Sequence, residues 1–525
     1  MTHPKLIETM MLPSFYPHRP ERIELVQTHI SFIFIVDDLV YKVKKAVDYG
    51  FLDFTSLEKR RFYCHEEVRL NRRLAPETYL EVVEIYEDAE GALRLGKGGR
   101  VCEYAVKMKK LPADRMLKKL LKDGCADVSV MDAVAEKLAA FHDQADTGGY
   151  IDEIGGVETI RLNHQENFEQ TEKYIGITIA EPLYRFIKRY IYDFMDRKID
   201  LLKQRVKEHR IRDCHGDLHL EHICMENGIV IFDCIEFNER FRYEDVAAEV
   251  AFLAMDLDFN NYKKWADRFV RSYIQYSKDH DIRILLNFYK CYYAYVRGKV
   301  TGFRIEDRKI VDEEITETKV TANRYFELAY GYAAQLERPT LIIMMGLMGT
   351  GKSRLTKNIA PVLDADVIRT DVLRKEMSNL SPTDRCYEPF GKGIYNEEMS
   401  EATYAKAHEL ALKTLREGRT VILDASYRKR SDRLKAGETA RAADADFIIV
   451  ECVCPEDVIR KRLEVRTLDA LEPSDGRWDL YEEQKKGFEP IEELSFTKHI
   501  VIDTSGLRET SADKVLNAIR FGVMG

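Results

Sequence analysis

Residues 341–353, LIIMMGLMGTGKS, restrict the possible folds of this chain more than any other stretch. Five consecutive apolar residues lead into Gly346, and the glycines, lysine and serine that follow have the GxxxxGKS spacing of a phosphate-binding loop. The apolar run predicts a buried parallel strand, and residues 354–363 can form a helix whose positive end faces an anion. This order of strand, loop and helix predicts a site for a nucleoside triphosphate.

The residue types in this loop have separate functions. Glycines let backbone N–H groups close around phosphate oxygens. The Lys352 ammonium is expected to reach the β- and γ-phosphates during catalysis, and the Ser353 hydroxyl is expected to bind Mg²⁺. The candidate nucleotide-binding residues of the loop are Gly346, Gly349, Thr350, Gly351, Lys352 and Ser353.

Length and composition limit what the rest of the chain can be. A chain of 525 residues exceeds one hydrophobic core, so two or more domains are expected. The net charge of −9 does not indicate a protein that binds nucleic acid constitutively. There is no apolar run of about 18 residues and no signal peptide pattern, which predicts a soluble cytoplasmic protein without a membrane partner. The ten cysteines form no CxxC pair and are expected to be reduced thiols.

Apolar and polar side chains alternate in the first hundred residues. Residues 31–36 and 39–45 flank an acidic two-residue turn and predict a β-hairpin. A helix is predicted over 57–76, and a second pair of strands over 80–86 and 102–108. The hairpin and the helix each contribute residues to the candidate site described below.

Residues 212–222, RDCHGDLHLEH, precede an apolar strand that ends at Asp233. An HGD loop before a short hairpin that closes with Asp is typical of phosphotransferases of the kinase type. Asp217 is expected to orient or deprotonate the attacking hydroxyl, and Asp233 to hold Mg²⁺ on the triphosphate.

Residues 20–330 resemble the aminoglycoside phosphotransferase group of the protein-kinase-like fold, which includes choline and fructosamine kinases. The segments that carry the resemblance are THIS, YKVKKAVDYGFLDF, EEVRLNRRLAP and CHGDLH. The resemblance implies an α+β kinase-like domain in which His215 and His219 shape the catalytic loop.

The same resemblance implies the residues that bind the nucleotide. Lys42 pairs with the α- and β-phosphates, and Lys44 is its alternative in the register. Glu67 braces that lysine from the helix, with Glu66 as the alternative. Met108 begins the connecting hinge whose backbone meets the adenine.

One position departs from the family pattern. The family has Asn five residues after the catalytic Asp as a second metal ligand, and this chain has His222. Mg²⁺ prefers oxygen ligands, whereas imidazole suits Mn²⁺ or Zn²⁺ better. Either Asp233 and Glu236 hold the metal between them, or catalysis in this half is weakened. A degenerate, regulatory kinase domain is therefore the alternative to an active one.

Residues 240–259 are predicted to form one apolar helix. Asp245 and Glu249 are four residues apart and share a face of it. The resemblance implies that this region contributes to an acidic substrate pocket, and solvated acids are the alternative.

A long charged helix is predicted over 304–337. It ends before Pro339, since proline disfavours helix in the residue that precedes it. The predicted domains are therefore residues 1–335 and 336–525.

Strands alternate with helices after the phosphate-binding loop. Two predicted strands end at Asp371 and Asp424, and two more are predicted over 447–454 and 499–505. This alternation favours an α/β domain with a doubly wound parallel sheet and a site at the carboxyl ends of its strands. Because Asp371 and Asp424 both lie at such ends, they are candidate active-site acids.

The C-terminal pattern resembles small P-loop kinases of the polynucleotide, gluconate and shikimate kinase type with an AAA-type ATP-binding domain, and is most similar to the first. The resemblance implies that Asp371 activates the acceptor hydroxyl. It also implies that Arg374 binds the acceptor's own phosphate and that Asp424 lies near the metal. The usual Walker B glutamate is absent, which disfavours a motor ATPase.

Further basic residues follow in this half. Arg460, Arg462 and Arg466 recur at helix spacing, and the last two are the candidate lid residues that cover the triphosphate. A solvated basic face is the alternative. The polar segment 381–409 is the candidate acceptor-binding insertion. Arg428 is a candidate contact for an anionic acceptor such as a nucleic-acid end, or part of an exposed helix start.

These features predict a kinase with two separate nucleotide sites. Each site is expected to bind ATP, or GTP as an alternative, with Mg²⁺ and to transfer the γ-phosphoryl to a hydroxyl. The expected acceptor is a small molecule in the N-terminal half, and a small molecule or a 5′-hydroxyl nucleic-acid end in the C-terminal half. Two alternatives are a regulatory protein whose N-terminal domain controls one active kinase, and an ATP-driven partner-binding module.

Overall fold

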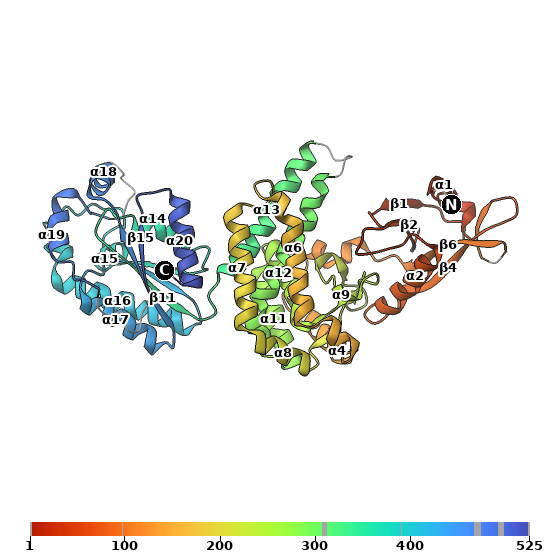
Figure 1. Cartoon of the computed structure of the whole chain (residues 1–525), viewed down its shortest axis with the longest axis horizontal. Helices are drawn as coiled ribbons and strands as arrows, with labels where there is room; N and C mark the ends of the chain where they lie inside the picture. Colours follow the sequence, from red (N-terminus) through yellow and green to blue (C-terminus); the bar gives the residue numbers. More distant parts are fainter. Residues whose placement is uncertain are drawn as a thin grey trace. The chain divides into compact units, whose positions relative to one another are not determined.

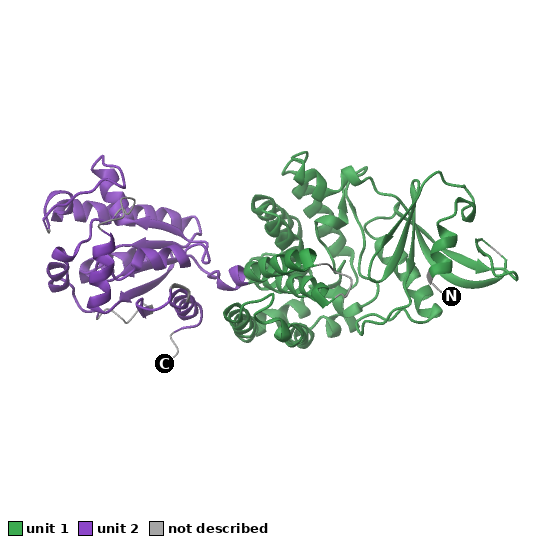
Figure 2. Cartoon of the chain, turned by 90° about the horizontal axis from the view of Figure 1, so that it is seen from above, with its two compact units in different colours: residues 1–329 green, residues 330–525 purple. Residues whose placement is uncertain are grey.

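The chain divides into two units, residues 1–329 and 330–525, which Figure 2 colours separately. The computed structural model describes residues 3–96, 98–306, 312–389, 391–466, 474–491 and 498–522. Helix α13 (Asp312–Ala334) runs through the division, shortly before the boundary expected between residues 335 and 336, which stays a prediction. Residues 307–311 of the charged helix predicted there lie outside the described residues.

An antiparallel sheet of six strands forms the N-terminal part of the first unit (Figure 1). Its strand order is β1-β2-β3-β6-β4-β5. The strands are β1 (Ile23–Gln27), β2 (Ser31–Val36), β3 (Leu39–Lys44), β4 (Tyr79–Glu87), β5 (Leu93–Leu95) and β6 (Arg100–Lys109). Val36 pairs with Leu39 across the acidic turn, where Asp37 adopts a φ of 50°, a left-handed conformation that Asp tolerates. The predicted hairpin and second strand pair are confirmed.

Helix α2 (Leu57–Asn71) packs against this sheet. The Ser56 side chain caps its N-terminus by accepting the backbone N–H of Lys59. Cys64 and Val68 of the helix pack with Val106 of β6 in one apolar cluster. Glu67 lies on the same buried face and is fully enclosed, so its carboxylate needs a partner.

Helices form most of the remainder of the first unit. They are α1 (His3–Met10), α3 (Leu117–Lys122), α4 (Val130–Gln144), α5 (Tyr150–Ile154), α6 (Val157–Thr171), α7 (Glu181–Arg197), α8 (Ile199–Lys207), α9 (Glu239–Arg242), α10 (Val246–Phe259), α11 (Lys263–Ser277) and α12 (Ile282–Phe303). Helix α10 is apolar on nearly all sides and is enclosed by α11 and α12. Two small antiparallel sheets pair β7 (Ile211–Asp213) with β10 (Tyr243–Asp245), and β8 (Ile223–Cys224) with β9 (Val230–Ile231).

The single helix predicted over 240–259 is wrong, because β10 separates α9 from α10. Asp245 ends β10 and caps α10 by accepting the backbone N–H of Ala247. Its carboxylate also pairs with the buried Arg205 at 2.5 Å. Asp245 is therefore a structural residue and not part of an acidic substrate pocket or a solvated face.

The second unit contains a parallel sheet of five strands in the order β12-β13-β11-β14-β15. The strands are β11 (Thr340–Met345), β12 (Asp366–Arg369), β13 (Val421–Asp424), β14 (Asp446–Val453) and β15 (Lys498–Asp503). The helices are α14 (Lys352–Ile359), α15 (Thr370–Met377), α16 (Glu397–Arg416), α17 (Arg430–Ala442), α18 (Glu456–Arg466), α19 (Tyr481–Lys486) and α20 (Arg508–Phe521). Helices α16 and α17 share an apolar core with the sheet, and α14 packs against α20. The predicted doubly wound parallel sheet is confirmed.

Two further expectations concern the whole chain. All ten cysteines are free. Within the described ranges, none of the helices combines the length and apolar character that a membrane crossing requires.

Candidate active sites

Two lysines of strand β3 share the carboxylate of Glu67 in the first unit. Lys42 Nζ lies 2.8 Å from Glu67 Oε1 and 2.8 Å from Asp233 Oδ1. Lys44 Nζ lies 2.6 Å from Glu67 Oε2 and also bonds Glu236. Burial works to lower the pKa of Lys42, but the charges of Asp233 and Glu67 outweigh it and raise that pKa well above its usual value. Lys42 is thus the lysine that joins the helix to Asp233.

The same contacts bear on two alternatives from the sequence: Glu66 in place of Glu67, and a metal shared by Asp233 and Glu236. Glu66 pairs with Arg69 on the outer side of α2 and does not reach the lysines. Glu236 is buried against Lys44, which disfavours the arrangement in which Asp233 and Glu236 share a metal.

Met108 lies in β6 with its side chain in the apolar cluster of α2. Its contact with adenine stays a prediction.

Asp217 and Asp233 lie on either side of His222. The Nδ1 of His222 donates to the backbone carbonyl of Asp217 at 2.8 Å, and its Nε2 lies 3.5 Å from Asp233 Oδ2. The Nε2 of His219 lies 3.7 Å from the Asp217 carboxylate. Burial works to raise the pKa of Asp217, but His219 and His222 outweigh it and hold the pKa below its usual range. Lys42 lowers the pKa of Asp233 in the same way against the effect of burial, so both acids are ionised in this site.

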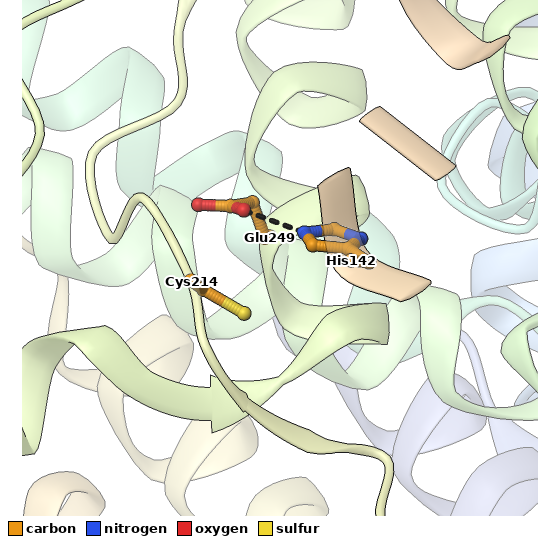
Figure 3. A group of neighbouring side chains, drawn as sticks. All are labelled: His142, Cys214 and Glu249. Atoms are coloured by element: carbon orange, nitrogen blue, oxygen red, sulfur yellow. Dashed lines mark hydrogen bonds and ion pairs between the residues drawn. The ribbon is translucent and has the colours of Figure 1, made fainter. Parts of the chain in front are cut away.

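A buried group braces the loop that carries Asp217, and Figure 3 draws its members Glu249 and His142. Glu249 of α10 accepts the backbone N–H groups of His215 at 2.8 Å and Gly216 at 2.7 Å. Its second oxygen lies 2.7 Å from His142 Nε2, and His142 Nδ1 lies 2.6 Å from the Tyr273 hydroxyl. These hydrogen bonds engage both ring nitrogens and both carboxylate oxygens, so the group braces the loop. Glu249 is neither solvated nor part of a substrate pocket.

Figure 3 also places the Cys214 side chain beside this pair. Its sulfur could complete a metal-binding group with His142 and Glu249, since one donor atom of each lies within 4.8 Å of the others. Burial raises the pKa of the Cys214 thiol well above its usual value, which disfavours the thiolate that metals bind.

In the second unit, β11 leads into the phosphate-binding loop and α14, as the sequence predicts. Gly346, Gly349 and Gly351 have φ values of 133°, 79° and 88°. A Cβ at Gly346 would come within 2.5 Å of the Cys452 carbonyl, so the loop needs glycine there. The Nζ of Lys352 donates to the carbonyls of Gly346 and Leu347 at 3.0 Å each. The lysine thus lies inside the loop that is expected to hold phosphate.

A cleft of about 1330 Å³ opens beside this loop. Lys352, Ser353, Asp371 and Asp424 all line it, so the structure brings the predicted acids and the loop together. Asp424 ends β13 and pairs in register with Met344 of β11. Burial raises the pKa of its carboxyl, even though Ser353 and Lys352 work to lower it.

Part of the acceptor segment predicted at 381–409 lines the same cleft, with Tyr395 and Ser400 among its lining residues. Phe390 of that segment lies outside the described residues. Arg374 is buried and donates to Ile394 O at 3.1 Å and Ser400 Oγ at 2.9 Å. Its Nε is enclosed without a hydrogen-bond partner. Arg374 therefore holds the segment in place, and its predicted contact with an acceptor phosphate stays a prediction.

Asp475 was not predicted as a site residue. Its carboxylate accepts the Tyr395 hydroxyl at 2.7 Å and lies 3.2 Å from Nζ of the fully buried Lys375. Its other oxygen accepts the backbone N–H of Cys386 at 3.3 Å. Asp475 thereby ties the acceptor segment to the chain that follows α18. Local sequence gives no signal for this contact, because its partners lie far away in the sequence.

The predicted arginines occupy different places around the cleft. Arg428, Arg462 and Arg466 line it. Arg462 also donates to the Thr504 carbonyl, which connects α18 to the end of β15. Arg460 instead pairs with Glu464 on the surface at 3.1 Å. The lid and acceptor roles of the three lining arginines stay predictions.

Gln484 of α19 is a further residue that the sequence did not single out. Its side-chain oxygen accepts the backbone N–H of Met348, inside the phosphate-binding loop, at 2.7 Å. Phosphate oxygens accept such N–H groups, so Gln484 and a phosphate would compete for the N–H of Met348.

Two family models match the chain. Residues 59–283 match a phosphotransferase enzyme family, and residues 341–491 match an AAA domain. Uncharacterized proteins of Mycobacterium tuberculosis and Mycobacterium bovis are each 30% identical to the chain over 449 residues. These matches cover 85% of this chain and 86% of each mycobacterial protein.

Two solved structures match part of the chain. The GDP complex of aminoglycoside 2′-phosphotransferase-IIIa is 15% identical with a TM-score of 0.40, and the match covers 61% of this chain and 98% of that one. The APS kinase of Mycobacterium tuberculosis, in complex with AMPPNP and APS, is 16% identical with a TM-score of 0.25, and the match covers 35% and 98%.

Proposed function

Because the chain belongs to the same family as these mycobacterial proteins and joins a phosphotransferase-family domain to an AAA domain, it is a kinase, and we propose that it has two nucleotide sites. Each site transfers the γ-phosphoryl of ATP, or of GTP, to a hydroxyl acceptor. The observation that carries this proposal is that each unit places a partly buried lysine near two carboxylates. Lys42 lies between Glu67 and Asp233, and Lys352 shares its cleft with Asp371 and Asp424.

In the N-terminal unit, Lys42 exchanges its contact with Asp233 for the α- and β-phosphates, while Glu67 keeps its ammonium in place. Asp217 accepts the proton of the acceptor hydroxyl as that oxygen attacks the γ-phosphorus. Its lowered pKa keeps it ionised and ready to accept a hydrogen bond from the hydroxyl. Asp233 and His222 are the residues that would hold the divalent cation, which neutralises charge on the triphosphate when bound.

In the C-terminal unit, the loop N–H groups and Lys352 hold the phosphates, and Lys352 stabilises the charge that develops on the transferred group. Asp371 orients the acceptor hydroxyl. Ser353 and Asp424 supply oxygen donors suited to Mg²⁺, which makes this set a fit for that ion. Arg462 and Arg466 cover the triphosphate from α18.

The acceptor of the N-terminal unit is a small molecule. The acceptor of the C-terminal unit is a small molecule or a 5′-hydroxyl nucleic-acid end, since Arg374 and Arg428 offer positive charge at the cleft. The proposal is tested with the full chain, γ-labelled ATP, a fractionated metabolite extract and a 5′-hydroxyl oligonucleotide. Asp217→Asn is expected to remove one class of labelled product, and Lys352→Ala another. Persistence of every product in either variant contradicts the proposal for that site.

A second candidate function is regulation of one active kinase by the N-terminal unit. His222 favours it, because imidazole replaces the amide that Mg²⁺ accepts in the family pattern. This candidate predicts that Asp217→Asn leaves all labelled products in place while an N-terminal ligand changes the C-terminal rate. The two-site proposal predicts that a product disappears.

A further inference from the structure

We propose that the N-terminal site binds its divalent cation through the Nε2 of His222 and therefore selects Mn²⁺ over Mg²⁺. This inference rests on the proposed nucleotide site at Lys42 and Asp233, and it adds which ion that site takes. Three observations carry it: the tautomer of His222, the atom that its free nitrogen faces, and the packing that fixes the ring.

The hydrogen bond at Nδ1 determines the tautomer of His222. Nδ1 lies 2.8 Å from the backbone carbonyl of Asp217, and a carbonyl oxygen can only accept. Nδ1 therefore carries the proton, and the neutral ring presents its lone pair at Nε2. That lone pair is the form of imidazole that binds a metal.

The Nε2 lone pair faces a second acceptor. Asp233 Oδ2 lies 3.5 Å away, which is too far for a hydrogen bond, and Oδ1 of the same carboxylate is engaged by Lys42. Two donor atoms bound at about 2.1 Å to one ion, with an angle between 90° and 110°, lie about 3.0–3.5 Å apart. The separation of Nε2 and Oδ2 matches that requirement.

Neighbouring rings fix the imidazole in this orientation. The ring centroids of His222 and His219 are 4.0 Å apart, and Phe232 lies on another side at 5.7 Å. The side chain of His222 is 13% exposed. The side chain of His222 therefore has little conformational freedom left to lose when a cation binds.

The other histidines nearby do not offer the same donor. His219 Nδ1 accepts the backbone N–H of Glu221 at 3.3 Å, so its Nε2 carries the proton and points at the Asp217 carboxylate. His142 has both ring nitrogens in hydrogen bonds. His222 is thus the histidine of this unit's candidate site that can bind a metal without breaking an existing contact.

The donor set decides the ion. Mg²⁺ dehydrates reluctantly and prefers oxygen, whereas Mn²⁺ accepts imidazole and carboxylate together. The set of Ser353 and Asp424 in the other unit contains oxygen donors, and it suits Mg²⁺. The two sites of one chain would then differ in the ion they take.

The test is pulsed EPR of Mn²⁺ bound to the full chain with a non-hydrolysable ATP analogue. Lys352→Ala is used as the background, because it removes the lysine that is proposed to bind the phosphates in the C-terminal unit. We expect a ¹⁴N hyperfine coupling from a histidine nitrogen that is lost in the added His222→Asn substitution and kept in His408→Asn. His408 is the matched control, since it is the histidine among the described residues that line the C-terminal cleft.

Binding of the analogue in the Lys352→Ala background is measured separately by calorimetry. Binding without the ¹⁴N coupling, or a coupling that survives His222→Asn, overturns the metal inference alone. No binding in this background overturns the N-terminal nucleotide site as well. A further readout is competition: Mg²⁺ should displace Mn²⁺ at a lower concentration in His222→Asn than in the unchanged site, and an equal or higher concentration contradicts the proposal. Unchanged thermal unfolding of His222→Asn confirms that the variant is folded.

Discussion

The Nε2 of His142 lies 2.7 Å from Oε2 of Glu249, next to the loop that carries Asp217. The other oxygen of Glu249 accepts two backbone N–H groups of that loop, from His215 and Gly216. The position of the candidate catalytic acid therefore depends on a carboxylate that does not touch any substrate.

Glu249→Ala is expected to destabilise the first unit and slow its phosphoryl transfer. The substitution leaves buried N–H groups without an acceptor, at a cost of about 1–3 kcal/mol for each group. Thermal unfolding and the N-terminal labelled product measure the two effects. Glu136→Ala, at an exposed position of α4, is the control and should change stability by less than about 0.5 kcal/mol. Equal effects of the two substitutions would contradict the role of Glu249.

Lys352→Met is expected to slow C-terminal turnover by about 10²–10³-fold, as expected when a donor that stabilises the transition state is removed. The N-terminal product should form at its normal rate. Product formation with saturating ATP measures both. Lys406→Met, in an exposed pair with Glu409, is the control. A loss of both products from Lys352→Met would show that the two sites are not independent.

Asp475→Asn is expected to destabilise the second unit and raise the Michaelis constant for its acceptor. Lys375 and Asp475 are both buried, and breaking such a pair costs about 3–5 kcal/mol. The matched control is Asp479→Asn, since Asp479 is 61% exposed in its pair with Arg477 and such pairs contribute about 0–1 kcal/mol. Chemical unfolding followed by fluorescence compares them. Similar losses of stability from Asp475→Asn and Asp479→Asn would contradict the bracing role of Asp475.

The stability of the first unit is expected to fall as pH falls from above 6.5 toward 3. Burial lowers the pKa of His164 to about 3, whereas the unfolded chain keeps the ordinary value of about 6.5. Between these values the unfolded state binds a proton that the folded state does not, so protonation favours unfolding. The midpoint of thermal unfolding, measured from pH 7.5 to 4.5, reports this slope.

The substitution that checks the assignment is His164→Phe, because the ring already lies among Phe168, Phe288 and Tyr292. It should flatten the dependence of the first unit on pH. His29→Phe, at an exposed position, should leave the slope as it is. A slope that is unchanged in His164→Phe would rule out this histidine as its source.

Local sequence predicted the parts of the fold that have a local cause. The strand of residues 341–345 is fully buried and the glycines after it need positive φ, so their pattern in sequence is strict. The hairpin at residues 31–44 follows in the same way from alternation around a short turn. The kinase-like and P-loop folds were both confirmed.

The contacts that sequence did not predict join distant segments. Asp245 and Glu249 look like two acids on one helix face, yet Asp245 meets Arg205 and Glu249 meets His142. Helical periodicity carries no information on either partner. The same holds for Glu236, which appears in sequence as an alternative metal ligand and in the structure as the partner of Lys44.

Arg433 illustrates the same limit in the second unit. It ends the basic run of residues 428–433, which begins with Arg428, the candidate contact for an anionic acceptor. Arg433 is nevertheless fully buried and donates to the backbone carbonyls of Tyr427, Glu489 and Pro490. Arg428 in the same run does line the cleft. Composition alone could not separate the two arginines.

The contacts of Asp475 with Tyr395, Lys375 and Cys386 also bear on how this domain could be redesigned. A chimera that takes only residues 381–396 from another kinase would replace Tyr395, whose hydroxyl donates to Asp475, while Asp475 and Lys375 stay in place without a partner on the new loop. Transplanting a new specificity into this scaffold therefore requires moving the stretch around Asp475 together with that loop, as one cassette drawn from two places in the gene.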